Sequence, residues 1–148
     1  MNKLFITLLV ITLGIQACDK KDAGTKGFDF SNTIAPYVAL SSTSAKTVKQ
    51  DTSIKFTFQM RTALQENVTV TYNVTGAVNL SNQTVVIERN KTSAVATVSI
   101  PANTITPPNT TAQAVLQVVK AVTASGRQLT LGQKNTPDKE KVTINITQ

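Results

Sequence analysis

The stretch TSIKFTFQM, residues 52–60, alternates apolar and polar side chains along its whole length. Successive side chains of an extended chain point to opposite faces, so alternation of this kind is typical of a half-buried β-strand. The side chains expected on the buried face are Ile54, Phe56, Phe58 and Met60. This segment predicts a strand packed against a hydrophobic core.

The segments around it repeat the pattern. Residues 67–74, NVTVTYNV, place Val68, Val70, Tyr72 and Val74 on one face and lead to Gly76, where the chain can turn. Tyr37 to Ser41 predicts a first strand, and KVTINIT, residues 141–147, predicts a last strand with Val142, Ile144 and Ile146 inward. A short strand is expected from Gln128 to Leu131, followed by a polar turn from Gly132 to Lys139.

The middle of the chain predicts a hairpin. Val78 to Leu80 is expected to form a brief strand, and Ser81-Asn82 a turn into QTVVIE, residues 83–88. Arg89-Asn90-Lys91 then separates QTVVIE from SAVATVSI, residues 93–100. In SAVATVSI one face carries Ala94, Ala96, Val98 and Ile100.

The following segment interrupts the strands. Pro101, Pro107 and Pro108 predict a loop between sheets or an excursion at an edge, because proline cannot donate to a ladder. AQAVLQVVKAVT, residues 112–123, is then a long strand, and its β-branched residues favour a strand over the rival helix. The strand is expected to show Leu116, Val118 and Val122 on one face, and Val115 and Val119 on the other.

Many short strands separated by turn residues predict an all-β protein: an antiparallel, immunoglobulin-like β-sandwich of about seven to nine strands over residues 36–148. The segment from Asn67 to Ile100 resembles the Calx-beta class of such domains, in which strands like VTVTY, TVVIE and SAVATVSI follow one another. That class binds calcium among acidic side chains on loops at one end. Here the acidic residues are widely separated, which argues against calcium: Asp51, Glu66, Glu88, Asp138 and Glu140.

The N-terminus predicts an export signal. Met1-Asn2-Lys3 is followed by an apolar run from Leu4 to Ile15 that is shorter than the roughly 20 residues needed to span a bilayer. Ile15-Gln16-Ala17-Cys18 resembles the bacterial lipobox, with Gln16 as its imperfect position. The resemblance implies cleavage of a signal peptide at residues 1–17 and attachment of diacylglycerol to Cys18. An ordinary thiol is the alternative, but Cys18 is the chain's single cysteine and has no partner for an internal disulfide.

Residues 18–35 are rich in charge and glycine and predict a flexible tether on which the lipid would hold the domain. Within it Phe28 and Phe30 are expected to pack against the base of the domain or to begin a strand. Asp19 next to the lipidated cysteine resembles an inner-membrane retention signal, and the tract Asp19 to Asp22 resembles a surface-export signal. We expect the outer membrane, on its periplasmic face or at the cell surface.

The composition excludes several functions. The net charge of +7 is scattered rather than clustered, so no nucleic-acid partner is expected. No histidine is present, which removes Ser-His-Asp and Cys-His catalysis, and no phosphate-binding glycine loop appears. Glu66 and Glu88 are the one carboxylate pair to consider for glycoside hydrolysis, and surface charges are the favoured interpretation. Tryptophan is absent, and Phe56, Phe58 and Tyr72 fall on core faces, which weakens a lectin interpretation.

These observations predict no enzyme, no cofactor and no metal. They favour a lipid-anchored cell-envelope protein that acts as an adhesive, structural or accessory binding module through loops or a sheet edge. The alternative is a subunit of a surface glycan-capture system that binds polysaccharide. The partners expected are the membrane, through lipid on Cys18, and an envelope protein or polysaccharide. The sequence leaves the oligomeric state open.

Overall fold

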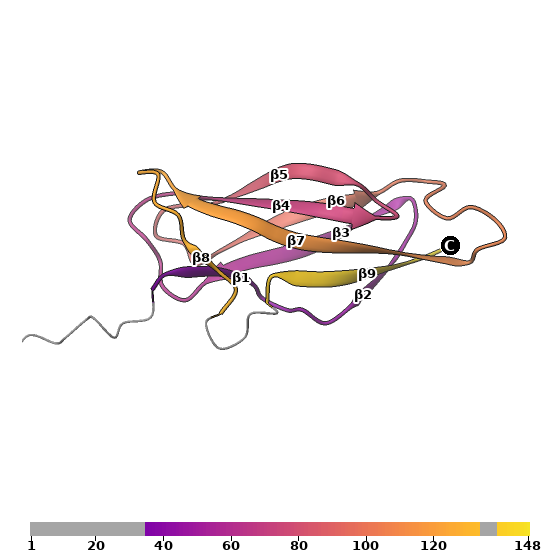
Figure 1. Ribbon diagram of the computed structural model, residues 1–148, viewed down its shortest axis with the longest axis horizontal. Helices are drawn as coiled ribbons and strands as arrows, with labels where there is room; N and C mark the ends of the chain where they lie inside the picture. The colour runs from indigo at the N-terminus through magenta and orange to yellow at the C-terminus, as the bar shows by residue number, and fades with distance from the viewer. Residues whose placement is uncertain (1–34, 134–138) are drawn as a thin grey trace, which may run out of the picture. The chain divides into compact units, whose positions relative to one another are not determined.

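The computed structural model describes residues 35–133 and 139–148, which build nine strands in two sheets (Figure 1). One sheet has the order β6-β3-β1-β8 and the other β2-β9-β7-β4-β5. The strands are β1 Tyr37–Leu40, β2 Lys46–Lys49, β3 Thr52–Met60, β4 Val68–Gly76, β5 Leu80–Ile87, β6 Ser93–Ile100, β7 Thr111–Thr123, β8 Thr130–Leu131 and β9 Lys141–Thr147. The predicted all-β sandwich is confirmed, and β7 is a strand rather than the rival helix. In the described ranges no helix is long and apolar enough to cross a membrane.

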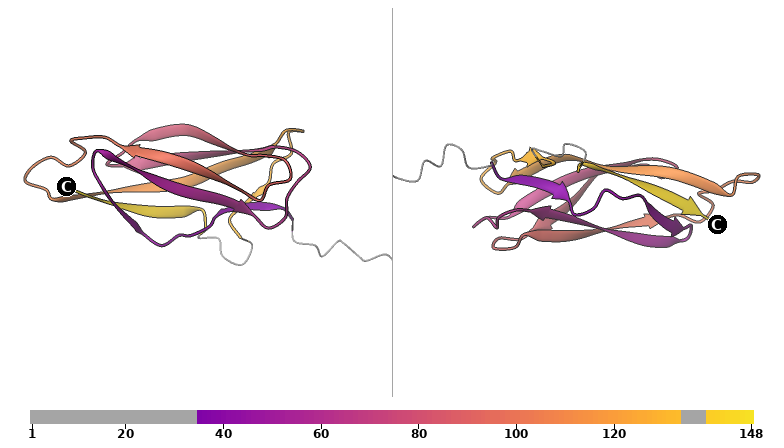
Figure 2. Two further views of the ribbon diagram at one scale, coloured as in Figure 1. Left: turned by 180° about the vertical axis from the view of Figure 1, so that it is seen from behind. Right: turned by 90° about the horizontal axis from the view of Figure 1, so that it is seen from below.

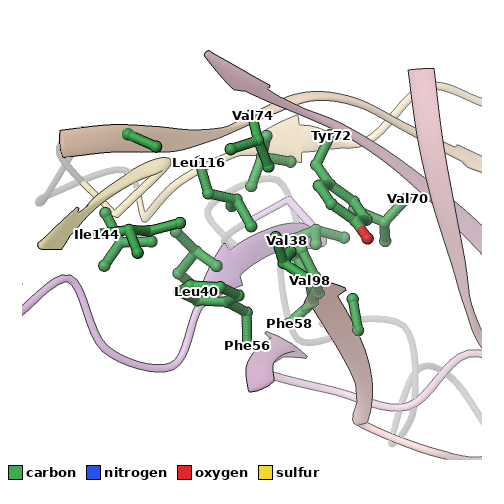
Figure 3. Close-up of a cluster of buried hydrophobic side chains, with 14 of the residues drawn as sticks. Val38, Leu40, Phe56, Phe58, Val70, Tyr72, Val74, Val98, Leu116 and Ile144 are labelled. Atoms are coloured by element: carbon green, nitrogen blue, oxygen red, sulfur yellow. The ribbon is translucent and has the colours of Figure 1, made fainter. Parts of the chain in front are cut away.

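The core lies between the two sheets, which stack as layers in the right-hand view of Figure 2. The alternation predicted for residues 52–60 is confirmed, since Phe56 and Phe58 are buried and Ile54 packs at the margin of the core. From the facing sheet Tyr72 meets Phe58 with a distance of 5.3 Å between ring centroids, a favourable tilted arrangement. Figure 3 shows these rings among aliphatic side chains of both sheets. The inward faces predicted for residues 68–74, 94–100 and 142–146 are also confirmed.

Two strand pairs are parallel, so the expectation of an antiparallel sandwich holds for most pairs but not for all. β1 pairs parallel with β8, and β2 pairs parallel with β9. Residues 41–45 carry the chain from the four-stranded sheet to the five-stranded sheet, so β1 and β2 belong to different sheets. β2 was not predicted, because it has only four residues and a weak apolar pattern in which Val48 is half-buried.

The predicted hairpin of QTVVIE with SAVATVSI is wrong. β5 lies at the edge of the five-stranded sheet, whereas β6 pairs antiparallel with β3 in the other sheet. The link between them crosses the sandwich because its backbone bonds to other loops: Arg89 N–H donates to Asn67 Oδ1 at 2.8 Å, and Asn90 N–H donates to the Leu64 carbonyl at 2.8 Å. Asn90 has φ +63°, a left-handed conformation that asparagine tolerates.

The predicted strand at Val78–Leu80 and turn at Ser81-Asn82 are also wrong. The turn comes earlier: Asn79 Oδ1 accepts from Gly76 N–H at 3.3 Å, and β5 starts at Leu80. Asn82 has φ +54° inside β5, and its N–H donates to Asn73 Oδ1 at 2.8 Å where the register with β4 shifts. The asparagine thus marks a β-bulge in the strand instead of a turn.

A second bulge, in β7, changes which side chains of that strand point inward. Thr71 pairs with Lys120 and Tyr72 with Val118, which leaves Val119 as the additional residue. A single inserted residue reverses inward and outward beyond it. Ala121 and Thr123 therefore point into the core, and Val122 points outward, contrary to the prediction that Val122 shares a face with Leu116 and Val118.

β8 begins at Thr130, so the strand expected from Gln128 is shorter, and Gln128 forms an isolated bridge with Val122. The predicted loop after Pro101 is confirmed as a connection between sheets, from β6 to β7. Residues 134–138 of the predicted polar turn lie outside the described residues.

We call the two ends of the sandwich the base and the tip. The base consists of loops 61–67, 88–92 and 124–129, and the tip consists of turns 50–51 and 77–79 with loop 101–110. The described chain starts at the base, where Tyr37 pairs with Thr130, and it finishes near the tip, where Gln50 N–H donates to the Thr147 carbonyl at 2.8 Å (Figure 1).

Candidate functional site at the base of the sandwich

The three loops of the base are joined by two consecutive residues, Glu66 and Asn67. The Asn67 side chain accepts from Arg89 N–H, and its backbone carbonyl accepts from Ala124 N–H at 2.9 Å. Glu66 accepts from Ser125 N–H at 2.9 Å and from Ser125 Oγ at 3.2 Å. These loop N–H groups have no partner in a strand ladder, and the hydrogen bonds to Glu66 and Asn67 satisfy them. The base is consequently a bonded unit rather than three separate loops.

Thr123 supplies the buried part of this unit. It is the last residue of β7, and its side chain lies inward at 4% exposure because of the bulge at Val119. Its hydroxyl lies 2.9 Å from Ser125 Oγ and accepts from Arg127 N–H at 3.1 Å. A buried hydroxyl is costly without such partners. The hydroxyl fixes the turn that presents Ser125 to Glu66.

The pKa of Glu66 is lowered from its ordinary value of 4.5. The hydrogen bond from Ser125 N–H is the largest cause, followed by that from the Ser125 hydroxyl, and the positive charge of Arg127 adds to them. Each of these favours the charged carboxylate. Glu66 is therefore a structural acceptor held in its ionised form, which is opposite to the raised pKa that a general acid needs at neutral pH.

Charge is distributed unequally between the two ends. The base loops carry four exposed cationic side chains, with Glu66 and Glu88 as their acidic residues: Arg61, Arg89, Lys91 and Arg127. The segments of the tip contain a single charged residue, Asp51. Scattered lysines and arginines in the sequence thus become a locally cationic surface at the end where the described chain begins.

The candidate acidic residues are not assembled into one site. Glu66 binds Ser125, whereas Glu88 is exposed and its backbone carbonyl accepts from Lys91 N–H at 3.0 Å. Asp51 lies before β3 at the tip, and Glu140 lies before β9. Within residues 35–133 and 139–148, no group of three or more acidic, histidine or cysteine residues is placed to hold a metal ion. Asp138 is outside the described residues.

The aromatic candidates divide into two groups. Phe56, Phe58 and Tyr72 are buried, so these three rings offer no platform for a sugar, and Tyr37 is half-buried in β1. Burial also raises the pKa of the Tyr72 hydroxyl. The lipidation candidate Cys18, with Phe28 and Phe30, lies outside the described residues.

Sequence reasoning missed Asn67, Thr123 and Ser125 as parts of the base. Asn67 directly precedes the strand pattern of residues 68–74, and asparagine is typical of turns because its side chain can bond to backbone groups. The signal for Thr123 was the polar residue at the end of an apolar run. Its inward orientation depends on the bulge at Val119, which alternation alone does not reveal.

No protein-family profile matches the chain, and none of the curated protein sequences matches it. Among solved structures it is similar to the apo-form Calx CBD1 domain, with a TM-score of 0.56 and 6% identity over 77% of this chain and 97% of that one. It is also similar to CBD12 from CALX1.2, with a TM-score of 0.52 and 6% identity over 75% of this chain and 44% of that one. The chain thus spans less than half of the second structure. At this identity the similarity concerns the fold, and it confirms a Calx-beta-like sandwich.

Proposed function

We propose that the protein is a non-enzymatic binding module that a lipid on Cys18 holds at the cell envelope, with the base of the sandwich toward the membrane. The observation that carries this proposal is the position of the first described residues. Ala35 and Pro36 lead into β1 at the base, next to the cationic loops. A tether from Cys18 would therefore join the domain at its most cationic end.

The charge of the base supports this orientation. Ala35 is 17 residues after Cys18, and a chain of that length spans at most about 60 Å when fully extended. Anionic lipid headgroups attract basic residues close to a membrane surface. Arg61, Arg89, Lys91 and Arg127 would therefore favour a base-down orientation, and the tip and sheet edges would face outward as surfaces for partners.

The absence of histidine from the sequence and the structural use of Glu66 support a role in binding rather than catalysis. We place the protein at the outer membrane, on its periplasmic face or at the cell surface, as the proposed site of this activity. A role in glycan capture receives less support, because the rings of Phe56, Phe58 and Tyr72 are committed to the core.

Metabolic labelling with a palmitate analogue in a bacterial host tests the anchor. The wild-type chain should be labelled and should fractionate with membranes, whereas Cys18→Ala should lose the label because the acceptor thiol is gone. Asp22→Ala, which leaves the cysteine in place, is the matched control and should keep the label. Equal labelling of wild type and Cys18→Ala would refute lipidation at this residue.

A further inference from the structure

The free edge of β6 differs from the other sheet edges in the described part of the chain. β8 has two residues, β2 has four residues including two lysines, and β5 is interrupted by the bulge at Asn82. Short length, charge and bulges are the usual devices that protect an edge from pairing with another chain. β6 pairs with β3 along all of Ser93–Ile100 without a register shift, and it contains no charged residue, proline or glycine.

The open side of β6 can be assigned residue by residue. Met60 N–H donates to the Thr92 carbonyl at 2.8 Å, so this pair belongs to the hydrogen-bonded class of the β3–β6 ladder. Hydrogen-bonded and non-hydrogen-bonded pairs alternate in an antiparallel ladder. The Thr57 carbonyl, opposite Val95, accepts from Ser41 N–H on the far side of β3, which agrees with this alternation. The backbone groups that face the open side therefore belong to four residues: Ser93, Val95, Thr97 and Ser99.

The same strand exposes apolar surface. Val95 is 53% exposed, the highest value among the large hydrophobic residues of the described chain, and it lies on the outer face beside Thr97. The inward residues Ala96 and Val98 are buried, which holds the strand in place. An added strand would find a fixed, neutral edge with main-chain donors and acceptors, as in recognition by β-strand addition.

We propose that β6 pairs antiparallel with β6 of a second copy of this chain, about a two-fold axis at Ala96. The four-stranded sheets of the two copies would then form one continuous sheet of eight strands. In this register Ser93 lies opposite Ser99 of the second copy, and Val95 lies opposite Thr97. Each outward backbone group of the four residues meets a complementary group, and side chains that face outward in one copy face outward in the other.

Three features favour a second copy as the occupant. A two-fold axis presents the same surface from both sides, and β6 meets itself with every outward backbone group paired. A shift that centres the pair on Thr97 brings Ser93 opposite Pro101, which has no N–H to donate. The uncharged strand also lets two chains of net charge +7 approach without opposing like charges along the ladder.

Analytical ultracentrifugation of the chain from residue 18 onward, carrying Cys18→Ala, tests the pairing. That chain should sediment as a dimer toward the upper end of a micromolar to millimolar concentration series. Val95→Lys should abolish the dimer, because it places like charges at the two-fold interface. Val119→Lys, at a 37% exposed valine of the other sheet, is the matched control and should leave the dimer intact. Circular dichroism and thermal unfolding establish that both variants are folded.

A monomer across the whole series, or equal dimerisation of Val95→Lys and the parent chain, would overturn the proposal. Disulfide formation between introduced cysteines tests the register. The parent chain carries Cys18→Ala and therefore has no other thiol that could react. In the proposed register Val95 and Thr97 form a hydrogen-bonded pair, whose Cα atoms lie about 5.5 Å apart, within disulfide range. A mixture of Val95→Cys and Thr97→Cys chains should form a mixed disulfide faster than Val119→Cys with Thr97→Cys. Equal rates would also overturn the proposal. Neither experiment involves the lipid, so both outcomes are independent of Cys18 labelling.

Discussion

Substitution of Gly76 by alanine tests how tightly the tip is built. Gly76 ends β4 with φ +110°, and an added Cβ would lie 2.7 Å from the Gln113 carbonyl oxygen and 3.1 Å from Ala114 Cα. Both atoms belong to the backbone of β7 and cannot rotate away as a side chain can. The same Gln113 carbonyl accepts from Ala77 N–H at 2.9 Å, so a shift that relieves the clash also disturbs this hydrogen bond.

The expected cost combines a torsional and a steric part. Forcing a residue with a Cβ into a left-handed conformation costs roughly 1–2 kcal/mol. A disturbed hydrogen bond adds about 1 kcal/mol, so we expect Gly76→Ala to lower the free energy of unfolding by about 2–3 kcal/mol. Gly126→Ala is the matched control, because Gly126 has φ +89° but nothing lies within 4 Å of its added Cβ. It should show the torsional part alone.

Urea unfolding of the chain carrying Cys18→Ala measures both effects through the midpoint at constant slope. For a domain of this size each kcal/mol also moves the melting temperature by about 4 °C, so thermal unfolding provides a second measurement. If Gly76→Ala is no more destabilising than Gly126→Ala, then the contact with Gln113 is not a constraint, and the reasoning about the tip is refuted.

Two further predictions concern the base and β7. Because the Ser125 hydrogen bonds lower the pKa of Glu66, its contribution to stability is present above the unfolded pKa and is lost as the pH falls through the lower folded value. Below pH 4.5 the melting temperature of the wild type should therefore fall more steeply than that of Glu66→Gln, and parallel curves would contradict this. In β7, Ala121→Lys should prevent folding, since Ala121 is fully buried, whereas Val122→Lys should change the free energy of unfolding by less than about 1 kcal/mol. Circular dichroism and urea unfolding compare them, and the reverse ranking would show that the bulge at Val119 is misplaced.

The strands with strict alternation were predictable because each had one face to bury. Phe56, Phe58, Tyr72 and Ile144 all lie where period two places them. In these strands every local choice agrees with the global fold, and one residue of slippage would expose the whole apolar face. The fold class followed from several such segments, and the structural similarity to Calx CBD1 agrees with it.

The wrong predictions for β5 and β7 arose where one additional residue in a strand changes which side chains point inward. Val119 adds a residue to β7, so Val122 points outward although the apolar pattern placed it on the face of Leu116 and Val118. Asn82 adopts φ +54° in the middle of β5. This conformation is typical of turns, but here it forms a bulge within the strand. In both cases the determining contact lies in the neighbouring strand β4. Local periodicity contains no information about that neighbour.

The wrong hairpin has a consequence for the surface of the protein. If β5 and β6 had formed a hairpin, β5 would have occupied one edge of β6, and β3 the other. The link through Arg89 and Asn90 instead takes β6 to the opposite sheet, where β3 pairs with one side and no strand of the described residues pairs with the other. Hydrogen bonds from that link to Asn67 and Leu64 hold this crossing. The loop contacts at the base therefore determine which backbone groups of Ser93–Ile100 are available to a second copy. Asn67→Ala removes the hydrogen bond to Arg89 N–H, so we expect it to destabilise the β5–β6 link before it destabilises the core.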